Sequence, residues 1–505
     1  MTTAQLQSLD HQHLWHPFTP MSLWLDADPL VITAAEGFHL IDSDGRRYLD
    51  GISSLWCNVH GHKVPQIDAA IRAQLEKVAH STLLGLANEP SILLADRLMK
   101  IVPPNLKKVF YSDAGATATE IAFKLAAQYW YNTGHPEKSE FIGFTEAYHG
   151  DTLGAMSIGR TEQFHKPYFP LLFKVHFAPT PFVYRWGEGS GFRVQGSAEE
   201  RKTGTDTVFP SSLKLEPLTL AQKKGTAQKK GADPISPSSL NPKPLTLNPH
   251  EVKRQALVAL TDLLDRHHHK IAAICIEPIV QGAAGMIVQP DGFLAEVRKL
   301  ATQYNTLLIC DEVATGFART GKMFAVEHEN VQPDLMCVAK GLTGGYLPLA
   351  ATFATQKVFD AFLGQPSEGK TFFHGHTYTG NPLACAAAIA NLDLMQQNQT
   401  VKNVATNAPK LAALLEPLKN HPHVGEIRQK GYMVGIELVK DKPAKTPFDP
   451  AQRTAHKLCH NLRNQGVILR PIADTIILMP APAMPVEHLQ TIVTALQAEL
   501  ASSKP

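Results

Sequence analysis

Between residues 107 and 355, short apolar runs alternate with longer stretches in which apolar residues recur every three or four positions. The short runs predict strands and the longer stretches predict helices. We expect strands at 107–112, 140–148 (with its exit), 271–280, 306–313, 334–341 and 349–355, and helices at 117–130, 252–267 and 292–305. Because the strands are apolar throughout, they predict an α/β unit with a largely parallel sheet covered by helices on both faces.

The two ends of the chain have a different pattern. Short strands are expected at 432–439, 466–471 and 475–480, with helices at 382–396 and 486–501. Residues 32–51 alternate short strands with an Asp-Gly turn, so we expect them to join the C-terminal part in a smaller α+β domain. The predicted organisation is residues 1–65 in the small domain and the lining of a site, 66–382 in a large domain, and 383–505 in the small domain.

Residues 188–250 interrupt the alternation. They are rich in Gly, Pro, Ser and Lys, and they repeat the sequences PLTL and AQKKG. Such a composition buries too little apolar surface to offset the entropy lost on ordering. We therefore expect a disordered or loosely packed surface insertion between two elements of the large domain.

An aromatic segment, HLWHPFTPM, occupies residues 13–21. Its two prolines exclude a helix through it. Trp15 and Phe18 give it more apolar weight than a disordered leader has. The segment either packs the chain end against a core or lines a site.

Composition narrows the functional classes. The chain has 505 residues, 44% of them hydrophobic, and a net charge of +2. Its Lys-rich run lies in the expected insertion, which does not favour nucleic-acid binding, and no apolar run has the length of a membrane span. The N-terminal residues carry no signal-peptide pattern. The six cysteines form no CxxC pair, so we expect a cytoplasmic protein. We interpret the three histidines at 267–269 as a solvated helix end and expect no metal site.

Charged residues end three of the apolar strands: Glu277, Asp311 and Lys340. Open parallel sheets bind ligands at this edge. One interpretation is an ion pair of Asp311 with Lys340 that closes the sheet edge, since an unpaired buried charge is costly. The other is a carbonyl-reactive lysine beside a carboxylate.

Two further features favour the second interpretation. Pyridoxal phosphate needs a lysine, a carboxylate for its ring nitrogen and a phosphate cradle. The sequence SDAGAT (112–117) lies between a strand and a helix, where Gly115 permits close approach of an anion to free N–H groups. Tyr148, after the next strand, could cover an aromatic ring. Together these residues predict a pyridoxal-phosphate site.

The run LLICDEVATGFARTGKMFAVEHENVQPDLMCVAKGLTGGYLPLAA (307–351) resembles the signature of class III aminotransferases. The segments HLWHPFTPM, SSLWCNVHGH (53–62), AHSTLL (79–84), FHGHTYTGNPLACA (373–386) and GVILRPIADTIILMP (466–480) are similar to those of the 7,8-diaminopelargonate synthases. The resemblance implies the fold of the aspartate aminotransferase type (fold type I). It also implies transamination of 8-amino-7-oxononanoate to 7,8-diaminononanoate in biotin biosynthesis.

The resemblance also implies cofactor contacts. Lys340 matches the Schiff-base lysine, Asp311 the partner of the pyridine nitrogen, and Tyr148 the aromatic residue that stacks on the ring. Residues 114–116 (Ala114, Gly115 and Ala116) match the phosphate loop, although Ala114 lacks the hydroxyl of the serine that is common there. Thr377, with His376 beside it, matches a phosphate ligand that reaches across a subunit interface, which implies a homodimer.

Substrate contacts follow in the same way. Arg470 matches the arginine that holds the substrate carboxylate, and Gly375 and Trp56 lie where substrate contacts are expected. Leu55 replaces the first of two tryptophans found in many members. Phe18 replaces a tyrosine of the members that use S-adenosylmethionine as amino donor, and members with phenylalanine here resemble the subgroup that uses lysine. The donor implied is S-adenosylmethionine or lysine, and Phe18 and Leu55 predict that lysine works at least as well.

Three alternatives remain open. The first is a class III enzyme for another ω-amino substrate, such as ornithine or 4-aminobutyrate. The second is an aminomutase of the glutamate-1-semialdehyde type, which shares Lys340 but needs no external donor. The third is a catalytically inactive cofactor-binding protein, against which the intact pair of Lys340 and Asp311 argues.

Deleting about residues 190–248 should leave folding and activity largely intact, because the expected insertion has little apolar content. Expression yield, thermal unfolding and turnover of the deletion variant measure this. Loss of dimerisation on deletion would contradict the prediction and give the insertion an ordered role.

Overall fold

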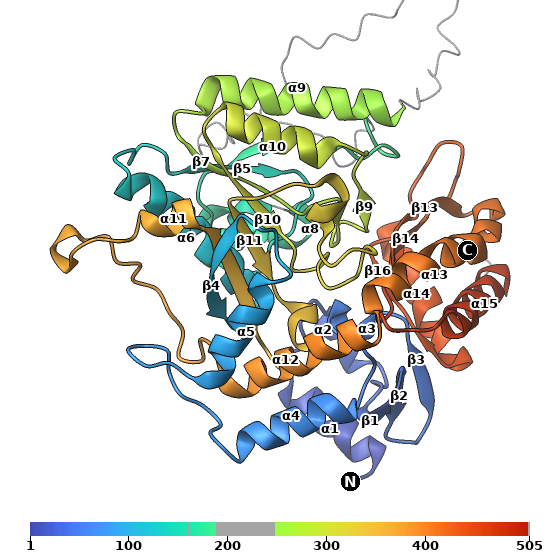
Figure 1. Cartoon of the computed structure of the whole chain (residues 1–505). Helices are drawn as coiled ribbons and strands as arrows, with labels where there is room; N and C mark the ends of the chain where they lie inside the picture. The colour runs from blue at the N-terminus through green and yellow to red at the C-terminus, as the bar shows by residue number, and fades with distance from the viewer. Residues whose placement is uncertain (160, 188–247, 503–505) are drawn as a thin grey trace, which may run out of the picture.

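The computed structural model describes residues 1–159, 161–187 and 248–502. A seven-stranded sheet forms its centre (Figure 1). The strand order is β4 (Leu106–Ser112), β12 (Ala350–Thr355), β11 (Leu335–Val338), β10 (Leu307–Asp311), β7 (Ile271–Ile276), β5 (Glu140–Phe144) and β6 (His176–Ala178). All neighbouring pairs are parallel except those of β12, which is antiparallel to β11 and to β4.

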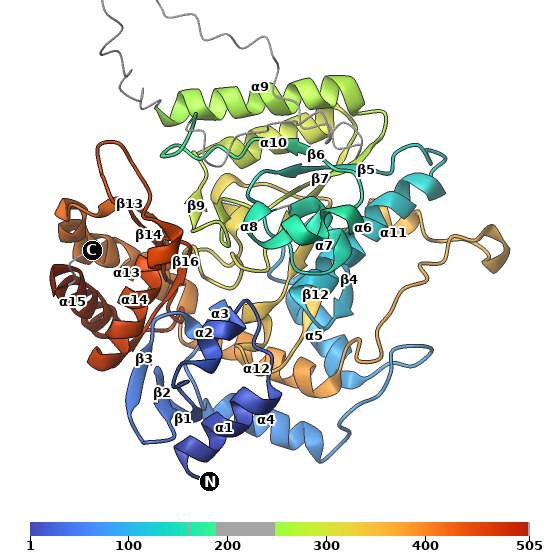
Figure 2. The same cartoon turned by 180° about the vertical axis from the view of Figure 1, so that it is seen from behind.

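Helices cover both faces of this sheet, as expected for strands that are apolar throughout. Alternate side chains of the strands enter two different cores. Cys275 and Ile309 pack with residues of α6 (Gly115–Asn132), whereas Ile274 and Leu308 pack with residues of α9 (Pro249–His267) and α10 (Phe293–Gln303). Figures 1 and 2 show α9 and α10 side by side along one side of the sheet.

The antiparallel strand β12 has a simple cause. A parallel return needs a crossover of a dozen or more residues, usually with a helix. Between β11 and β12 the chain forms only a 3₁₀ turn, Lys340–Thr343, and a short loop. The chain therefore turns back on itself, and the sheet is mixed at this one strand.

The helix α9 shortens the predicted insertion. We expected the insertion to end at residue 250, but α9 begins at Pro249. The Asn248 side chain caps it by accepting a hydrogen bond from the Glu251 N–H at 2.9 Å. The rest of the predicted insertion, residues 188–247, lies outside the described residues. A deletion that spares the cap should therefore end at residue 247.

Two smaller sheets lie beside the large one. The first has the order β1 (Ile32–Glu36), β2 (His39–Asp42), β3 (Arg47–Asp50) and β15 (Val467–Ile468), and it joins the two ends of the chain through the parallel pair β3 and β15. The second has the order β13 (Val424–Lys430), β14 (Met433–Leu438), β17 (Thr475–Leu478) and β16 (Arg470–Ile472). A two-stranded pair, β8 (Val280–Gln281) and β9 (Ile287–Val288), follows β7.

The remaining α-helices pack around these sheets. They are α1 (Thr3–His13), α2 (Met21–Leu25), α3 (Ser53–Trp56), α4 (Pro65–Leu75), α5 (Glu89–Met99), α7 (Leu153–Gly159), α8 (Glu162–His165), α11 (Gln356–Asp360), α12 (Pro382–Gln397), α13 (Thr400–Leu415), α14 (Thr454–Asn461) and α15 (Val486–Ser502). Residues 14–20 of the aromatic segment connect α1 and α2 without a helix, as its prolines require.

Two connections lie next to each other at one edge of the molecule. Residues 361–381, between α11 and α12, run out from the large sheet (Figure 1). They meet the connection between α4 and α5, where the His80 and Tyr378 rings are 4.9 Å apart. Within the described residues, the helices all fall short of the length and apolar character needed to cross a membrane.

Candidate functional site

A cavity of about 640 Å³ opens at the carboxyl edge of the large sheet. The ends of five strands contribute to it: residues 113–116 follow β4, Tyr148 and His149 follow β5, and Glu277 follows β7. Asp311 ends β10, and Lys340 comes two residues after β11. The topology thus brings together residues that are distant in the sequence, as open parallel sheets do at this edge.

Among the described residues that line this cavity, Lys340 is the only lysine. Its backbone has a φ of 43°, in the left-handed region that non-glycine residues rarely adopt. Burial lowers the pKa of Lys340, and the charges of Asp311 and Glu277 offset part of that effect. Its Nζ lies 5.2 Å from the centre of the Trp56 ring. A desolvated amine of this kind is deprotonated more readily than a surface lysine and is nucleophilic when neutral.

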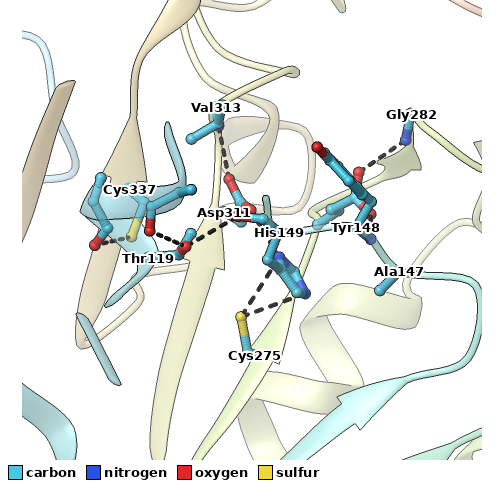
Figure 3. A network of polar contacts seen from close by, with 12 residues as sticks. Thr119, Ala147, Tyr148, His149, Cys275, Gly282, Asp311, Val313 and Cys337 are labelled. Atoms are coloured by element: carbon cyan, nitrogen blue, oxygen red, sulfur yellow. Dashed lines mark hydrogen bonds and ion pairs between the residues drawn. The ribbon is translucent and has the colours of Figure 1, made fainter. Parts of the chain in front are cut away.

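Asp311 pairs with His149, with 2.7 Å between Oδ2 and Nδ1. Figure 3 shows the His149 ring between Asp311 and Cys275, whose Sγ lies 3.7 Å from Nε2. Burial lowers the pKa of His149, but the hydrogen bond and charge of Asp311 outweigh it and raise the pKa overall. Among the described residues, His149 takes the place that the first interpretation gave to Lys340 as ion partner of Asp311. Lys340 is therefore not committed to closing the sheet edge.

Glu277 is a second buried carboxylate in the cavity wall. Its oxygens accept hydrogen bonds from the N–H groups of Tyr148, at 3.0 Å, and Gly282, at 2.8 Å. Burial raises the pKa of Glu277 to about 7, although the charge of His149 opposes the rise. Glu277 thereby fixes the loop that carries Tyr148.

The first turn of α6 has the shape of a phosphate cradle. A Cβ at Gly115 would lie 2.6 Å from Val313 Cγ1, so a side chain there would collide with the cavity wall. The N–H groups at the start of a helix have no intrahelical partners and attract anions. Ala114 precedes the turn, and its N–H donates to the Thr117 hydroxyl at 3.0 Å. The cradle would bind a phosphate through backbone groups, without a hydroxyl from residue 114.

Tyr148 lines the cavity, and Arg470 lies near Tyr148 but outside the lining. The Tyr148 hydroxyl donates to Asp151 Oδ2 at 2.8 Å, and burial, followed by the Asp151 charge, raises the pKa of Tyr148. Arg470, on β16, is close enough for its charge to act on Tyr148. Burial lowers the pKa of Arg470. The lysine, the carboxylate, the helix N-terminus and the aromatic ring together fit pyridoxal phosphate.

Several residues predicted for the site lie outside the cavity lining. Phe18 is 54% exposed and packs edge-on against Phe164, with 5.5 Å between ring centres. Leu55 is also exposed and lies outside the lining, whereas the adjacent Trp56 lines the cavity. Arg470 is absent from the lining as well. Phe18 therefore lies outside the cavity lining among the described residues of one chain, and its predicted contact with substrate stays a prediction.

The predicted substrate contact Gly375 and the predicted phosphate ligand Thr377 are both exposed. His376 lies against the cradle, where its Nδ1 is 3.0 Å from Asp113 Oδ1. Asp113 in turn accepts a hydrogen bond from the Thr117 hydroxyl at 2.9 Å.

Sequence reasoning missed the part of the site that holds Asp311. The position of His149 directly after a predicted strand was a signal that it lies at the binding edge of the sheet. Its partner, Asp311, lies 162 residues further along the chain and could not be identified from that position. Cys57 and Asp113 also line the cavity without having been predicted. A pattern of apolar residues cannot identify such long-range partners.

Comparisons with known proteins agree with this geometry. The family model described as "Aminotransferase class-III" matches residues 23–199 and 219–500. The adenosylmethionine-8-amino-7-oxononanoate aminotransferase of Nitratidesulfovibrio vulgaris is 45% identical over 493 residues, which cover 97% of this chain and 80% of the relative. The protein of the same name from Geobacter sulfurreducens is 43% identical over 495 residues, which cover 98% of this chain and 97% of the relative.

Two solved structures are similar over nearly their whole length. The adenosylmethionine-8-amino-7-oxononanoate aminotransferase of Methanocaldococcus jannaschii has a TM-score of 0.83 and 36% identity, and the match covers 99% of this chain and 100% of that one. An amine transaminase from an uncultivated Pseudomonas species, solved in the PLP-bound form, has a TM-score of 0.82 and 32% identity, with coverage of 97% and 98%. The predicted fold class is thereby confirmed.

A further buried carboxylate next to the site, Glu312, gives a test by pH. Burial raises its pKa to about 7, and hydrogen bonds from the Thr315 hydroxyl and the Val326 N–H oppose the rise. Because the pKa of Glu312 is about 7 in the folded chain and 4.5 in the unfolded chain, the folded state binds the proton more tightly. The folded state is therefore most favoured below about pH 4.5, and it loses this stabilisation as the pH rises from 4.5 through 7. Glu312→Gln should therefore lose less stability between pH 5 and pH 7.5 than the parent.

Urea midpoints at the two pH values measure this difference. Glu329→Gln is the control, because Glu329 lies in the same connection and accepts the Gly292 and Ala295 N–H groups while only half-buried. Equal pH dependence in the parent and the Glu312→Gln variant would contradict the prediction.

Proposed function

The chain belongs to the class III aminotransferases, which depend on pyridoxal phosphate, and we propose that it aminates 8-amino-7-oxononanoate to 7,8-diaminononanoate in biotin biosynthesis. The observation that carries this proposal is the 39–45% identity, over nearly the full length, with five relatives named for that substrate. The buried lysine and carboxylate at the edge of the large sheet support the same activity.

Lys340 is the residue that we assign to proton transfer. Pyridoxal phosphate, when bound, supplies an electron sink for the carbon that gains or loses the amino group. Because burial lowers the pKa of Lys340, its amine can exist in the neutral form, in which it binds a carbonyl carbon or accepts a proton at Nζ. The ammonium formed in this way can then return that proton next to the reacting carbon, so one residue serves both directions of the transfer.

Asp311 and Tyr148 would hold the cofactor ring. The contact of Asp311 with His149 orients the carboxylate at the cavity wall. An ionised carboxylate at this point would hold a proton on a ring nitrogen. The first turn of α6 would bind the phosphate, and Arg470 offers a planar guanidinium for the substrate carboxylate.

For the amino donor we propose S-adenosylmethionine, because it appears in the names of the relatives. The prediction from Phe18 and Leu55 that lysine works at least as well stays a prediction. Phe18 packs on Phe164, which contacts His165, whose ring stacks on that of Tyr148 at 6.1 Å. Through these rings Phe18 can influence the cavity without lining it.

We also propose a homodimer. Large apolar side chains are exposed on the two neighbouring connections 76–88 and 361–381 and on the helix after the first: Leu84, Leu86, Ile92, Leu93, Phe373 and Tyr378. Contiguous exposed apolar surface of this kind is typical of subunit interfaces. The position of Thr377 on one of these connections would let it reach a second copy.

All six cysteines are free thiols, which supports a reducing, cytoplasmic environment.

Replacing Lys340 by Ala should reduce turnover more than about a thousandfold, because the described part of the cavity lining offers no other amine to move the proton. The visible absorbance of the bound cofactor should also change, and mass spectrometry of 7,8-diaminononanoate measures turnover. Lys357→Ala, on α11, is the matched control and should behave as the parent. Retained turnover in the Lys340→Ala variant would contradict the assignment.

The protein loaded with pyridoxal phosphate should form 7,8-diaminononanoate from 8-amino-7-oxononanoate when S-adenosylmethionine is supplied. Mass spectrometry of reactions with S-adenosylmethionine, with lysine and with no donor measures this. Turnover with lysine alone would contradict the proposed donor. Turnover without a donor would favour an aminomutase, and exclusive use of ornithine or 4-aminobutyrate would favour another ω-amino substrate.

A further inference from the structure

The turn that carries Trp56 into the cavity has an unusual backbone. Ser53, Ser54 and Trp56 have φ values of 46°, 61° and 62°, all in the left-handed region. Residues other than glycine rarely adopt this conformation, and they keep it only where surrounding contacts impose it. The turn therefore depends on groups that hold it.

The Asp50 carboxylate is the main group that holds this turn. Its Oδ1 accepts the Ile52 N–H at 3.2 Å, and its Oδ2 accepts the Ser54 N–H at 2.7 Å. Oδ2 also lies 3.0 Å from His62 Nε2. Asp50 is 2% exposed, and a buried carboxylate needs several donors to compensate for lost water. Here the donors are the turn itself and one histidine.

Asn58 fixes which nitrogen of His62 faces Asp50. The Asn58 side chain exchanges two hydrogen bonds with the Gly61 backbone, so its oxygen and nitrogen are distinguished. Its amide nitrogen lies 3.3 Å from His62 Nδ1, which must accept. The ring N–H is therefore at Nε2, where it donates to Asp50.

Contacts with distant parts of the chain hold the turn on its other side. The Ser53 hydroxyl donates to the Met479 carbonyl at 2.8 Å. The buried Arg319 donates to the carbonyls of Asn58, at 2.9 Å, and Pro480, at 2.6 Å. Residues of the signature segment (307–351) and of the C-terminal part of the chain thus both hold the turn by hydrogen bonds.

The turn places Trp56 at one wall of the cavity. Its ring centre lies 5.2 Å from Lys340 Nζ, and a Cβ on Gly282 would be 3.3 Å from its Cζ3. We propose that Asp50, oriented by His62, is a positioning residue of the active site: it holds the strained turn 53–57 so that Trp56 lies against Lys340 and forms a wall for the amino acceptor. The statement about the acceptor rests on the proposed function, whereas the statement about the turn does not.

Asp42 provides a matched control in the same small sheet. It is also buried, and its carboxylate accepts the N–H groups of Asp44, at 3.0 Å, and Arg46, at 2.8 Å, and the Tyr48 hydroxyl at 2.8 Å. It holds a turn between β2 and β3 and takes no part in the cavity lining. Asp42→Asn therefore removes a buried carboxylate that holds a turn, as Asp50→Asn does, but it changes no residue that holds Trp56 in the cavity wall.

The thiol of Cys57 reports on the turn without substrate or cofactor. Cys57 follows Trp56 and is half-buried, whereas the other five cysteines are buried. In Asp50→Asn the amide nitrogen faces N–H donors, so the turn should open more often, and labelling of Cys57 by 5,5′-dithiobis(2-nitrobenzoate) should become about tenfold faster. Asp42→Asn should label at the parent rate, and a Cys57→Ser background should abolish the increase.

Steady-state kinetics gives the second readout. The KM for 8-amino-7-oxononanoate should rise about tenfold in Asp50→Asn, in the same direction as in Trp56→Ala. Asp42→Asn should lower thermal stability alone. If Asp50→Asn fails to fold, His62→Ala removes one donor to Asp50 and should increase labelling in the same way.

Parent-like labelling in Asp50→Asn or His62→Ala, or equal changes in the Asp42 and Asp50 variants, would overturn the inference. A parent enzyme that does not use 8-amino-7-oxononanoate would contradict the proposed function, while the labelling experiment would still decide on the role of Asp50.

Discussion

The buried contact between Asp311 and His149 is the interaction on which the site depends. A carboxylate at the end of a central strand costs free energy when it is removed from water, and an oriented imidazole at 2.7 Å offsets that cost. Because His149 supplies this partner, Lys340 stays available as a buried amine. Glu277 and Glu312 form no ion pair with any described residue, and burial raises their pKa values to about 7.

Much of the large domain follows from the hydrophobic pattern. The apolar runs ending at Asp311 and Glu277 are central strands, and the stretches between them are the covering helices. The edge at which these strands end, and hence the neighbourhood of Lys340, follows from the parallel arrangement. The direction of β12 did not follow, because it depends on the length of the connection after Lys340. The start of α9 depended on one capping side chain, that of Asn248.

The remaining parts of the site depend on contacts that a single sequence does not encode locally. His149 meets Asp311 across 162 positions, and Ser53 meets Met479 across 426. The aromatic segment near the N-terminus also illustrates this. Its prolines correctly exclude a helix, but whether Phe18 enters the cavity depends on the position of Phe164. Apolar character identified these residues, and only the fold determines which of them meet.

The position of β6 has a consequence for how the gene can change. Within the described residues, β6 is the last strand of the large sheet and pairs with β5 alone, and the connection from β6 to α9 begins at that edge. The family model resumes its match after skipping residues 200–218 in this same connection. Codons gained here lengthen a connection whose described residues include no strand of the large sheet and no residue of the cavity lining. Length variation among relatives should therefore accumulate between β6 and α9, where replication errors cost the enzyme least.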